Sequence, residues 1–165
     1  PQILIAGCGT GQHSIHTASR FKDCSVTAID LSLSSLAYAK RKTKEVNVTN
    51  INYFQADILD LTTLGKQFDI IESGGVLHHM ADPISGWKIL TNCLKPRGLM
   101  RIGLYSELAR QDIVKARSII AERKISSKKE SIRDFRQQII KLGDPQMNIL
   151  AGLNDFYSKR TFKKR

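Results

Sequence analysis

The most constraining feature of this 165-residue chain is the stretch 2–11, QILIAGCGTG, in which a short apolar run leads directly into glycines at positions 7, 9 and 11. The run Ile3, Leu4, Ile5 is typical of a buried parallel strand. Glycine lets the backbone turn sharply and approach a ligand closely, and a helix that follows presents free N–H groups. The stretch therefore predicts a strand, a nucleotide-binding turn and a helix, in that order.

The spacing of these glycines distinguishes between ligands. The dinucleotide fingerprint G-x-G-x-x-G would place its third glycine at position 12, where this chain has Gln12. The third glycine comes one residue earlier, at Gly11. The spacing argues against a nicotinamide oxidoreductase, which is the alternative enzyme class for this loop.

Four further apolar runs, with helical patterns between them, predict an alternating α/β fold. The strands are expected over 25–29, 51–55, 68–72 and 99–104, and the helices over 11–21, 34–45, 82–94, 107–124, 128–142 and 144–157, with a short helix or turn over 57–67. On the first helix Ile15, Ala18 and Phe21 share one side. On the helix that begins at Asp82-Pro83, the expected buried stripe is Ile84, Trp87, Leu90 and Leu94. Such alternation specifies right-handed crossovers and a parallel sheet, which binds ligands at the carboxyl ends of its strands.

With these residues in place, roughly residues 2–105 resemble the class I S-adenosylmethionine-dependent methyltransferases. The resemblance rests on GCGTG at 7–11, the acid after the second strand, VLHHMADP at 76–83 and LKPRGLMRIGLY at 94–105. It implies a three-layer Rossmann-like α/β fold with a mostly parallel sheet of order 3-2-1-4-5, and S-adenosyl-L-methionine as cofactor. The chain is also similar to methyltransferase domains that follow tetratricopeptide repeats in some bacterial proteins, which implies such repeats or another flanking domain as a partner.

The resemblance implies a cofactor site at the strand ends, with Asp30 on the ribose and residues 56–58 beside the adenine. The implied cofactor-binding residues are Gly7, Cys8, Gly9, Thr10, Gly11, Asp30, Leu31, Ala56, Asp57, Ile58, Ser73 and Gly74. The alternative for Asp30 is an acid that stabilises a helix N-terminus, and for Asp57 it is a cap of the next turn. One position departs from the family: many members carry an acid two residues before the first glycine, near the amino acid end of the cofactor, and this chain has Ile5.

The chain divides in sequence into a cofactor-binding core at 1–106, a helical extension of the same domain at 107–158 and a basic tail at 159–165. The last two strands of a complete class I sheet do not appear in the sequence, so we expect a piece of a longer protein; the alternative is that the helical extension replaces this edge of the sheet. The alternative function is accordingly a truncated or non-catalytic cofactor-binding domain.

The charge distribution, the cysteines and the histidines indicate which partners, compartment and metal ligands are expected for this chain. The net charge of +11 is unevenly distributed along the chain. Residues 1–105 carry 11 basic and 8 acidic side chains, so most of the excess positive charge comes from the residues after 105. The basic tail predicts a solvated segment, and it is the route by which the chain could bind nucleic acid. Three cysteines without a C-x-x-C pair favour a reducing cytoplasm, and no apolar run is long enough for a membrane. His13 and His16 lack a third ligand, so no metal site is expected.

The expected chemistry is transfer of a methyl group from a sulfonium to an acceptor nucleophile. Alignment and desolvation are the main contributions of the protein, and a base is needed only for a hydroxyl or a protonated amine. His78 and His79 are the candidate bases, and the alternative is that one packs while the other faces solvent. The D/N/S-P-P-Y/F motif of enzymes that methylate amino groups of nucleic acid bases is replaced by Glu72-Ser73-Gly74-Gly75, so a small molecule or a protein side chain is the preferred acceptor.

Overall fold

The computed structural model describes residues 1–21, 23–106, 108, 111–142 and 151. The chain divides into two compact units, Pro1–Leu104 and Tyr105–Arg165. The first unit carries a five-stranded parallel sheet of order β3-β2-β1-β4-β5, which confirms the predicted order. Its strands are β1 Gln2–Ala6, β2 Ser25–Asp30, β3 Ile51–Gln55, β4 Phe68–Gly74 and β5 Leu94–Gly103.

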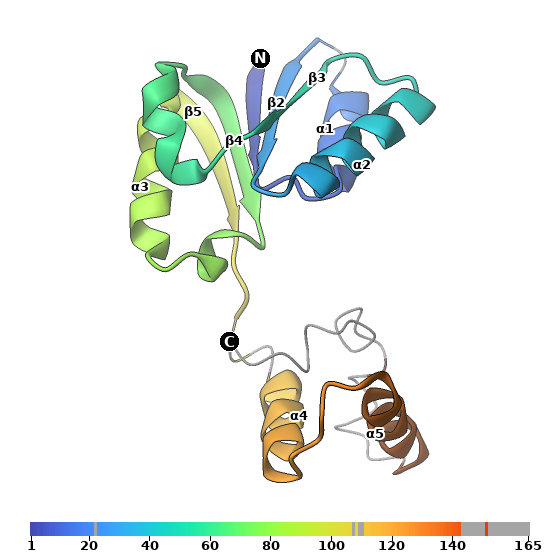
Figure 1. Ribbon diagram of the computed structural model, residues 1–165. Helices are drawn as coiled ribbons and strands as arrows, with labels where there is room; N and C mark the ends of the chain where they lie inside the picture. Colours follow the sequence, from blue (N-terminus) through green and yellow to red (C-terminus); the bar gives the residue numbers. More distant parts are fainter. Residues whose placement is uncertain (22, 107, 109–110, 143–150, 152–165) are drawn as a thin grey trace. The chain divides into compact units, whose positions relative to one another are not determined.

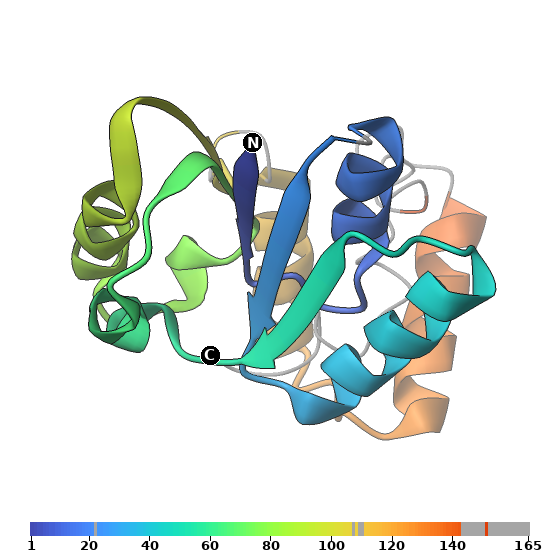
Figure 2. The same ribbon diagram turned by 90° about the horizontal axis from the view of Figure 1, so that it is seen from above.

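Helices cover both faces of the sheet, as Figure 1 and the view from above in Figure 2 show. On one face, α1 Gln12–Arg20 and α2 Leu33–Glu45 enclose an apolar cluster that includes Ile3 and Ile5 of β1. On the other face, the 3-10 helix Ile58–Leu64 and α3 Pro83–Asn92 pack over Leu4, Phe68 and Ile71. The predicted three-layer α/β fold is confirmed, and the two clusters hold the strand ends that form the candidate site.

The buried face of α1 differs from the predicted one. Ala18 is buried as expected, but the other buried positions of this helix are the small polar residues Ser14 and Thr17. Phe21 is 47% exposed, because α1 ends at Arg20 before the ring can reach the sheet. Small side chains on this face let the helix lie close to the sheet.

The helix α3 begins where the sequence predicts and ends earlier. The Asp82 carboxylate accepts hydrogen bonds from the N–H groups of Ile84 and Ser85, both at 3.0 Å, which is the predicted N-cap. The helix ends at Asn92, so Leu94 lies in β5 and not in the helical stripe. Pro96 and Gly98, expected to separate the helix from the strand, lie within β5 where its register with β4 shifts, a position that tolerates proline.

The predicted apolar stripe of α3 was right for Leu90, which is buried, and wrong for Ile84 and Trp87. Trp87, expected in the core, is 40% exposed, and Ile84 is 58% exposed. The residues of this helix that are buried are Gly86 and Leu90, four positions apart on one face. A Cβ at Gly86 would collide with Met80 and lie 3.2 Å from Leu77, so the missing side chain lets this face of α3 pack against the segment that follows β4, with the indole on the exposed side.

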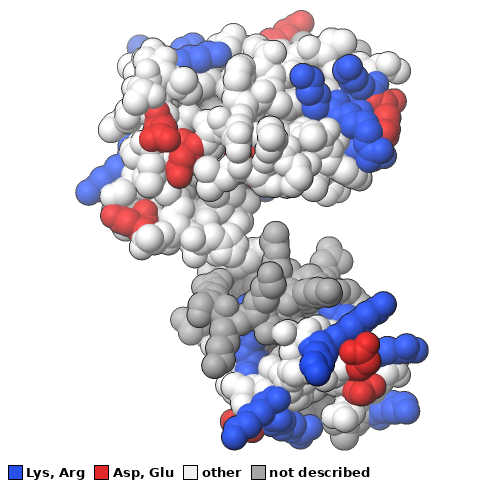
Figure 3. Space-filling model, viewed as in Figure 1, with Lys and Arg blue, Asp and Glu red and all other residues white. Residues whose placement is uncertain are grey.

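The described part of the second unit contains two helices, α4 Gln111–Glu122 and α5 Lys129–Leu142. They pack through Ile113, Ala116, Ile120, Phe135 and Ile139. Lys and Arg side chains cover much of the visible surface of this unit (Figure 3). Of the helix predicted over 144–157 only residue 151 is described, the basic tail lies outside the described residues, and the assignment of 107–158 to the same domain stays a prediction.

Candidate functional site

The glycine turn after β1 is held in a conformation that favours glycine. Gly7, Gly9 and Gly11 have positive φ angles of 78°, 53° and 83°. A Cβ at Gly7 would collide with the side chain of Val76, and one at Gly11 would lie 2.6 Å from the Ala39 Cβ. A Cβ at Gly9 would meet nothing within 4 Å. Two glycines thus serve packing, and Gly9 faces open space at the edge where a ligand can approach.

Asp30 fixes this turn against the end of β2. Its Oδ2 accepts a hydrogen bond from the N–H of Gly9 at 2.7 Å, and its Oδ1 accepts one from the N–H of Ser32 at 2.9 Å. The N–H groups of Gly7 and Cys8 donate to the Ile29 carbonyl oxygen at 2.9 and 2.8 Å. The loop and the carboxylate therefore form one preassembled unit.

The turn opens α1 without a capping side chain. Gly11 is the N-cap residue, no side chain in the described residues bonds to its N-terminal N–H groups, and its first turn carries no acid. The N–H groups of a helix start attract negative charge and polar oxygens. This end of α1 is suited to bind an oxygen-bearing ligand that lies on the glycine turn.

The segment after β3 forms the neighbouring part of the edge. The Ala56 N–H donates to the Asp30 carbonyl oxygen at 3.3 Å, which ties this segment to the end of β2. The Asp57 carboxylate accepts from the Leu59 N–H at 2.9 Å and so caps the 3-10 helix, the alternative considered for this residue. Ile58 is buried and Leu31 is 65% exposed. The structure thus brings Leu31, Ala56 and Asp57 to the same edge as Asp30.

Cys8 and Ser73 are buried within the turn and the strand end. Burial, with a contribution from the Asp30 carboxylate, raises the pKa of the Cys8 thiol to about 12, so this thiol is protonated and not a nucleophile at neutral pH. Ser73 is 1% exposed, and its hydroxyl has no hydrogen-bond partner among the described residues. A ligand or water at this strand end would satisfy that hydroxyl.

A cavity of about 160 Å³ lies at the ends of β4 and β5, and sequence reasoning missed two of the charged residues that line it. Its lining consists of His13, Glu72, Ser73, Gly74, Arg101 and Gly103. The Glu72 Oε2 lies 2.8 Å from the His13 Nε2 and accepts a hydrogen bond from the Thr17 hydroxyl at 3.2 Å. An acid directly after the apolar pair Ile70-Ile71, near the end of the strand FDIIESG, was the signal for Glu72. Its pairing with α1 could not be read from the sequence.

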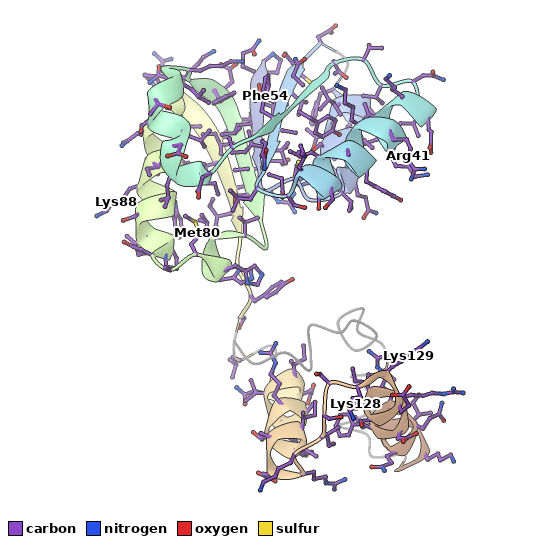
Figure 4. The ribbon with its side chains drawn as sticks, in the orientation of Figure 1. Arg41, Phe54, Met80, Lys88, Lys128 and Lys129 are labelled. Atoms are coloured by element: carbon purple, nitrogen blue, oxygen red, sulfur yellow. The ribbon has the colours of Figure 1, made fainter. Side chains whose placement is uncertain are left out.

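The histidine pair follows β4 on the short helix Leu77–His79. The His78 and His79 rings are in contact, with their centroids 4.1 Å apart and their planes tilted by 56°, and neither histidine lines the cavity. Leu77 is buried, and Met80 packs against Gly86 of α3 (Figure 4), so the pair is held from both sides. His13 pairs with Glu72, and the described residues contain no cluster of His, Cys, Asp and Glu that could hold a metal ion.

Comparison with known proteins supplies the family context of this site. A family model described as a methyltransferase domain matches residues 3–98. An uncharacterized protein of Synechococcus sp. is 37% identical over 122 residues, which are 73% of this chain and 29% of that protein. The chain therefore spans less than a third of the length of this curated relative. In the part of the chain that the structure describes, no helix is long and apolar enough to cross a membrane.

Two solved structures are similar to this chain. The crystal structure of coclaurine N-methyltransferase bound to N-methylheliamine and SAH matches with a TM-score of 0.56 and 27% identity, over 61% of this chain and 30% of that chain. The structure of PKMT2 from Rickettsia typhi in complex with AdoHcy matches with a TM-score of 0.77 over 99% of this chain and 35% of that chain. At 18% identity, the second likeness concerns the fold alone. Both likenesses agree with the Rossmann-like arrangement of the first unit.

Proposed function

The chain belongs to the class I S-adenosylmethionine-dependent methyltransferases, and from this membership we propose that it binds S-adenosyl-L-methionine on the glycine turn and transfers the methyl group to a small molecule or a protein side chain. The observation that carries the proposal is the Asp30 carboxylate, which holds the Gly9 and Ser32 N–H groups at the end of β2. A carboxylate has about four lone-pair sites, so two remain for a ribose diol. The residues present therefore fit the nucleoside part of this cofactor.

The other residues of the edge have distinct roles in the proposed complex. The open side of Gly9 admits the nucleoside, and the uncapped N-terminus of α1 faces the same turn. The exposed Leu31 side chain and the segment Ala56, Asp57 and Ile58 border the adenine. The buried Ser73 hydroxyl and Gly74 lie at the far end of the site.

Methyl transfer requires few reactive groups from the chain itself. When bound, S-adenosylmethionine supplies an electrophilic methyl group on a positively charged sulfur. The chain has to align the acceptor with that methyl group and exclude water, which in well-oriented systems lowers the barrier by roughly 7 kcal/mol or more. An acceptor hydroxyl or ammonium group also loses a proton, and the adjacent pair His78 and His79 is the proposed base for that case.

Titration calorimetry of the chain with S-adenosylmethionine and, separately, with NAD tests the proposal. We expect binding of the first alone, and weakening of that binding by roughly 10- to 100-fold in Asp30→Asn, because a hydrogen bond to a charged group is lost. Asp23→Asn is the matched control, since this exposed acid precedes the amino end of the same strand β2. Preferential binding of NAD, or equal effects of the two substitutions, would contradict the proposal.

A non-catalytic cofactor-binding role is the second candidate, supported by the share of the relatives that the chain covers, 29% and 30%. A methyl-transfer assay on the longer protein against this chain separates the two candidates. The three cysteines are free and buried, which supports the expectation of a reducing compartment such as the cytoplasm. Tetratricopeptide repeats, and nucleic acid bound through residues 159–165, stay predictions.

A further inference from the structure

Glu72 is a carboxylate on an apolar face of the sheet. It pairs across the parallel ladder with Ile5 of β1 and with Arg101 of β5, so the three side chains share a face. Ile3, Ile5 and Ile70 belong to the apolar cluster beneath α1 and α2, and the Glu72 side chain is only 16% exposed. A charge in such a place is costly unless a partner compensates it. The position therefore calls for an explanation beyond surface solvation.

The two oxygens of this carboxylate are held unequally. Oε2 is engaged by α1, through the His13 Nε2 at 2.8 Å and the Thr17 hydroxyl at 3.2 Å. Oε1 has a longer contact, 3.7 Å to the Arg101 Nη1, and the Arg101 side chain is 75% exposed. The helix thus orients the carboxylate through Oε2, while Oε1, with its longer contact, has room to accept a hydrogen bond from a ligand in the cavity that Glu72 lines.

On these contacts we propose that Glu72 binds the α-ammonium group at the amino acid end of S-adenosylmethionine, and that Arg101 binds the α-carboxylate of the same end. The proposal rests on the function proposed above and adds the residues that recognise this end of the cofactor. A cavity of about 160 Å³ that carries one carboxylate and an exposed guanidinium is complementary to a zwitterion. Guanidinium and carboxylate groups pair well because their donors and acceptors match in geometry.

The location of the cavity relative to Asp30 supports this assignment. Strand β1 lies between β2 and β4, so Asp30, at the end of β2, and Glu72, two residues before the end of β4, lie on opposite sides of the strand that leads into the glycine turn. Two strand spacings of about 4.8 Å separate these strands by roughly 10 Å. A ligand that joins a ribose to an α-amino acid by a short alkyl chain can span that distance. The register also places Glu72 directly beside Ile5, the position at which many members of the family carry an acid.

A purely structural role for Glu72, as an anchor of α1 through His13, is the competing explanation. The binding of three ligands distinguishes this structural role from the proposed binding role. S-adenosylmethionine carries the amino acid end and the sulfonium charge, S-adenosylhomocysteine carries the amino acid end alone, and 5′-methylthioadenosine carries neither. We expect Glu72→Gln to weaken the binding of the first two by roughly 10- to 100-fold and to leave the binding of 5′-methylthioadenosine unchanged.

Two further variants sharpen the calorimetric test. Arg101→Met should weaken the same two ligands and spare 5′-methylthioadenosine. Asp69→Asn is the matched control, because this acid lies near the amino end of the same strand β4, where it pairs with Lys95 at 2.9 Å; it should change none of the three affinities. Unchanged binding of 5′-methylthioadenosine also demonstrates that the Glu72→Gln chain retains its folded glycine turn.

The outcomes are distinct. Equal weakening of all three ligands by Glu72→Gln would overturn the inference in favour of the structural role, and weakening of S-adenosylmethionine alone would mean that Glu72 faces the sulfonium. Unchanged binding of all three would overturn it as well. If the unsubstituted chain bound none of the three ligands, the proposed function itself would fail.

Discussion

Alanine substitution at Gly9 and at Gly11 distinguishes a glycine that ligand access requires from one that packing requires. Both have positive φ angles, so an alanine at either position costs about 1 kcal/mol of backbone strain. At Gly11 the new Cβ would also lie 2.6 Å from the Ala39 Cβ and 3.0 Å from the Tyr53 hydroxyl, whereas at Gly9 it would meet nothing within 4 Å. Overpacking of this kind adds about 1–3 kcal/mol. We therefore expect Gly11→Ala to lower the free energy of unfolding by about 2–4 kcal/mol, and Gly9→Ala by about 1 kcal/mol.

Denaturant unfolding followed by tryptophan fluorescence measures these free energies of unfolding. The signal reports on the unit Pro1–Leu104, which contains the glycine turn, because Trp87 is the single tryptophan of the chain and lies on α3. Calorimetry with S-adenosylmethionine supplies the second readout. Gly9→Ala should weaken binding although the chain remains folded, because its methyl group occupies the open side of the turn. Equal loss of stability in the two variants, or unimpaired binding by Gly9→Ala, would refute the division of roles between these glycines.

Three further predictions concern burial and titration. Phe68→Ala, which empties a position that is 1% exposed, should cost about 3–5 kcal/mol, and Trp87→Ala, at a 40% exposed position, should cost clearly less when unfolding is followed by circular dichroism; the reverse order would contradict the observed orientation of α3. The Cys8 thiol should resist alkylation at pH 8 in the folded chain and react after unfolding, and because its pKa is raised from 9.0 to about 12, stability should fall as the pH rises through that interval; fast labelling of the folded chain would contradict this. The Ser85 hydroxyl and N–H lower the pKa of Asp82, so the stabilisation by this cap is present at neutral pH and is lost as the pH falls through the lowered pKa, and Asp82→Asn should reduce that acid dependence in pH-dependent melting curves.

The sequence predicted the sheet well because its inner strands β1 and β2 are buried on both faces and read as continuous apolar runs. Strands β1 and β2 are almost fully buried, and the predicted strand 51–55 has the observed bounds. The buried faces of the helices were harder to predict from the sequence. The apolar residues of α3 are compatible with more than one buried face, and the close packing at Gly86 determines which face is buried. Leu94 continued the helical spacing and yet lies in β5, because tertiary pairing with β4 overrides local periodicity.

The candidate site was predictable where it follows from the glycine turn and the strand ends. The structure brings Asp30 to Gly9 as expected, since the carboxyl ends of neighbouring parallel strands meet at one edge. Glu72 was missed as a site residue, because its role depends on the cross-strand neighbour Ile5 and on the Thr17 and His13 side chains of α1. Contacts between residues more than fifty positions apart are set by register and helix rotation, which a single sequence does not specify.

The bonds from Asp30 to Gly9 and Ser32 affect how measurements on this residue should be interpreted. The carboxylate is already bound by its own chain in the absence of ligand, so much of the entropy of ordering the turn has been lost during folding. A substitution at Asp30 removes the proposed ribose contact and also releases the turn. The binding free energy lost on substitution is therefore the sum of two contributions, the lost contact with the ligand and the lost preorganisation of the turn. Hydrogen exchange at the Gly9 amide in the free protein measures the second contribution.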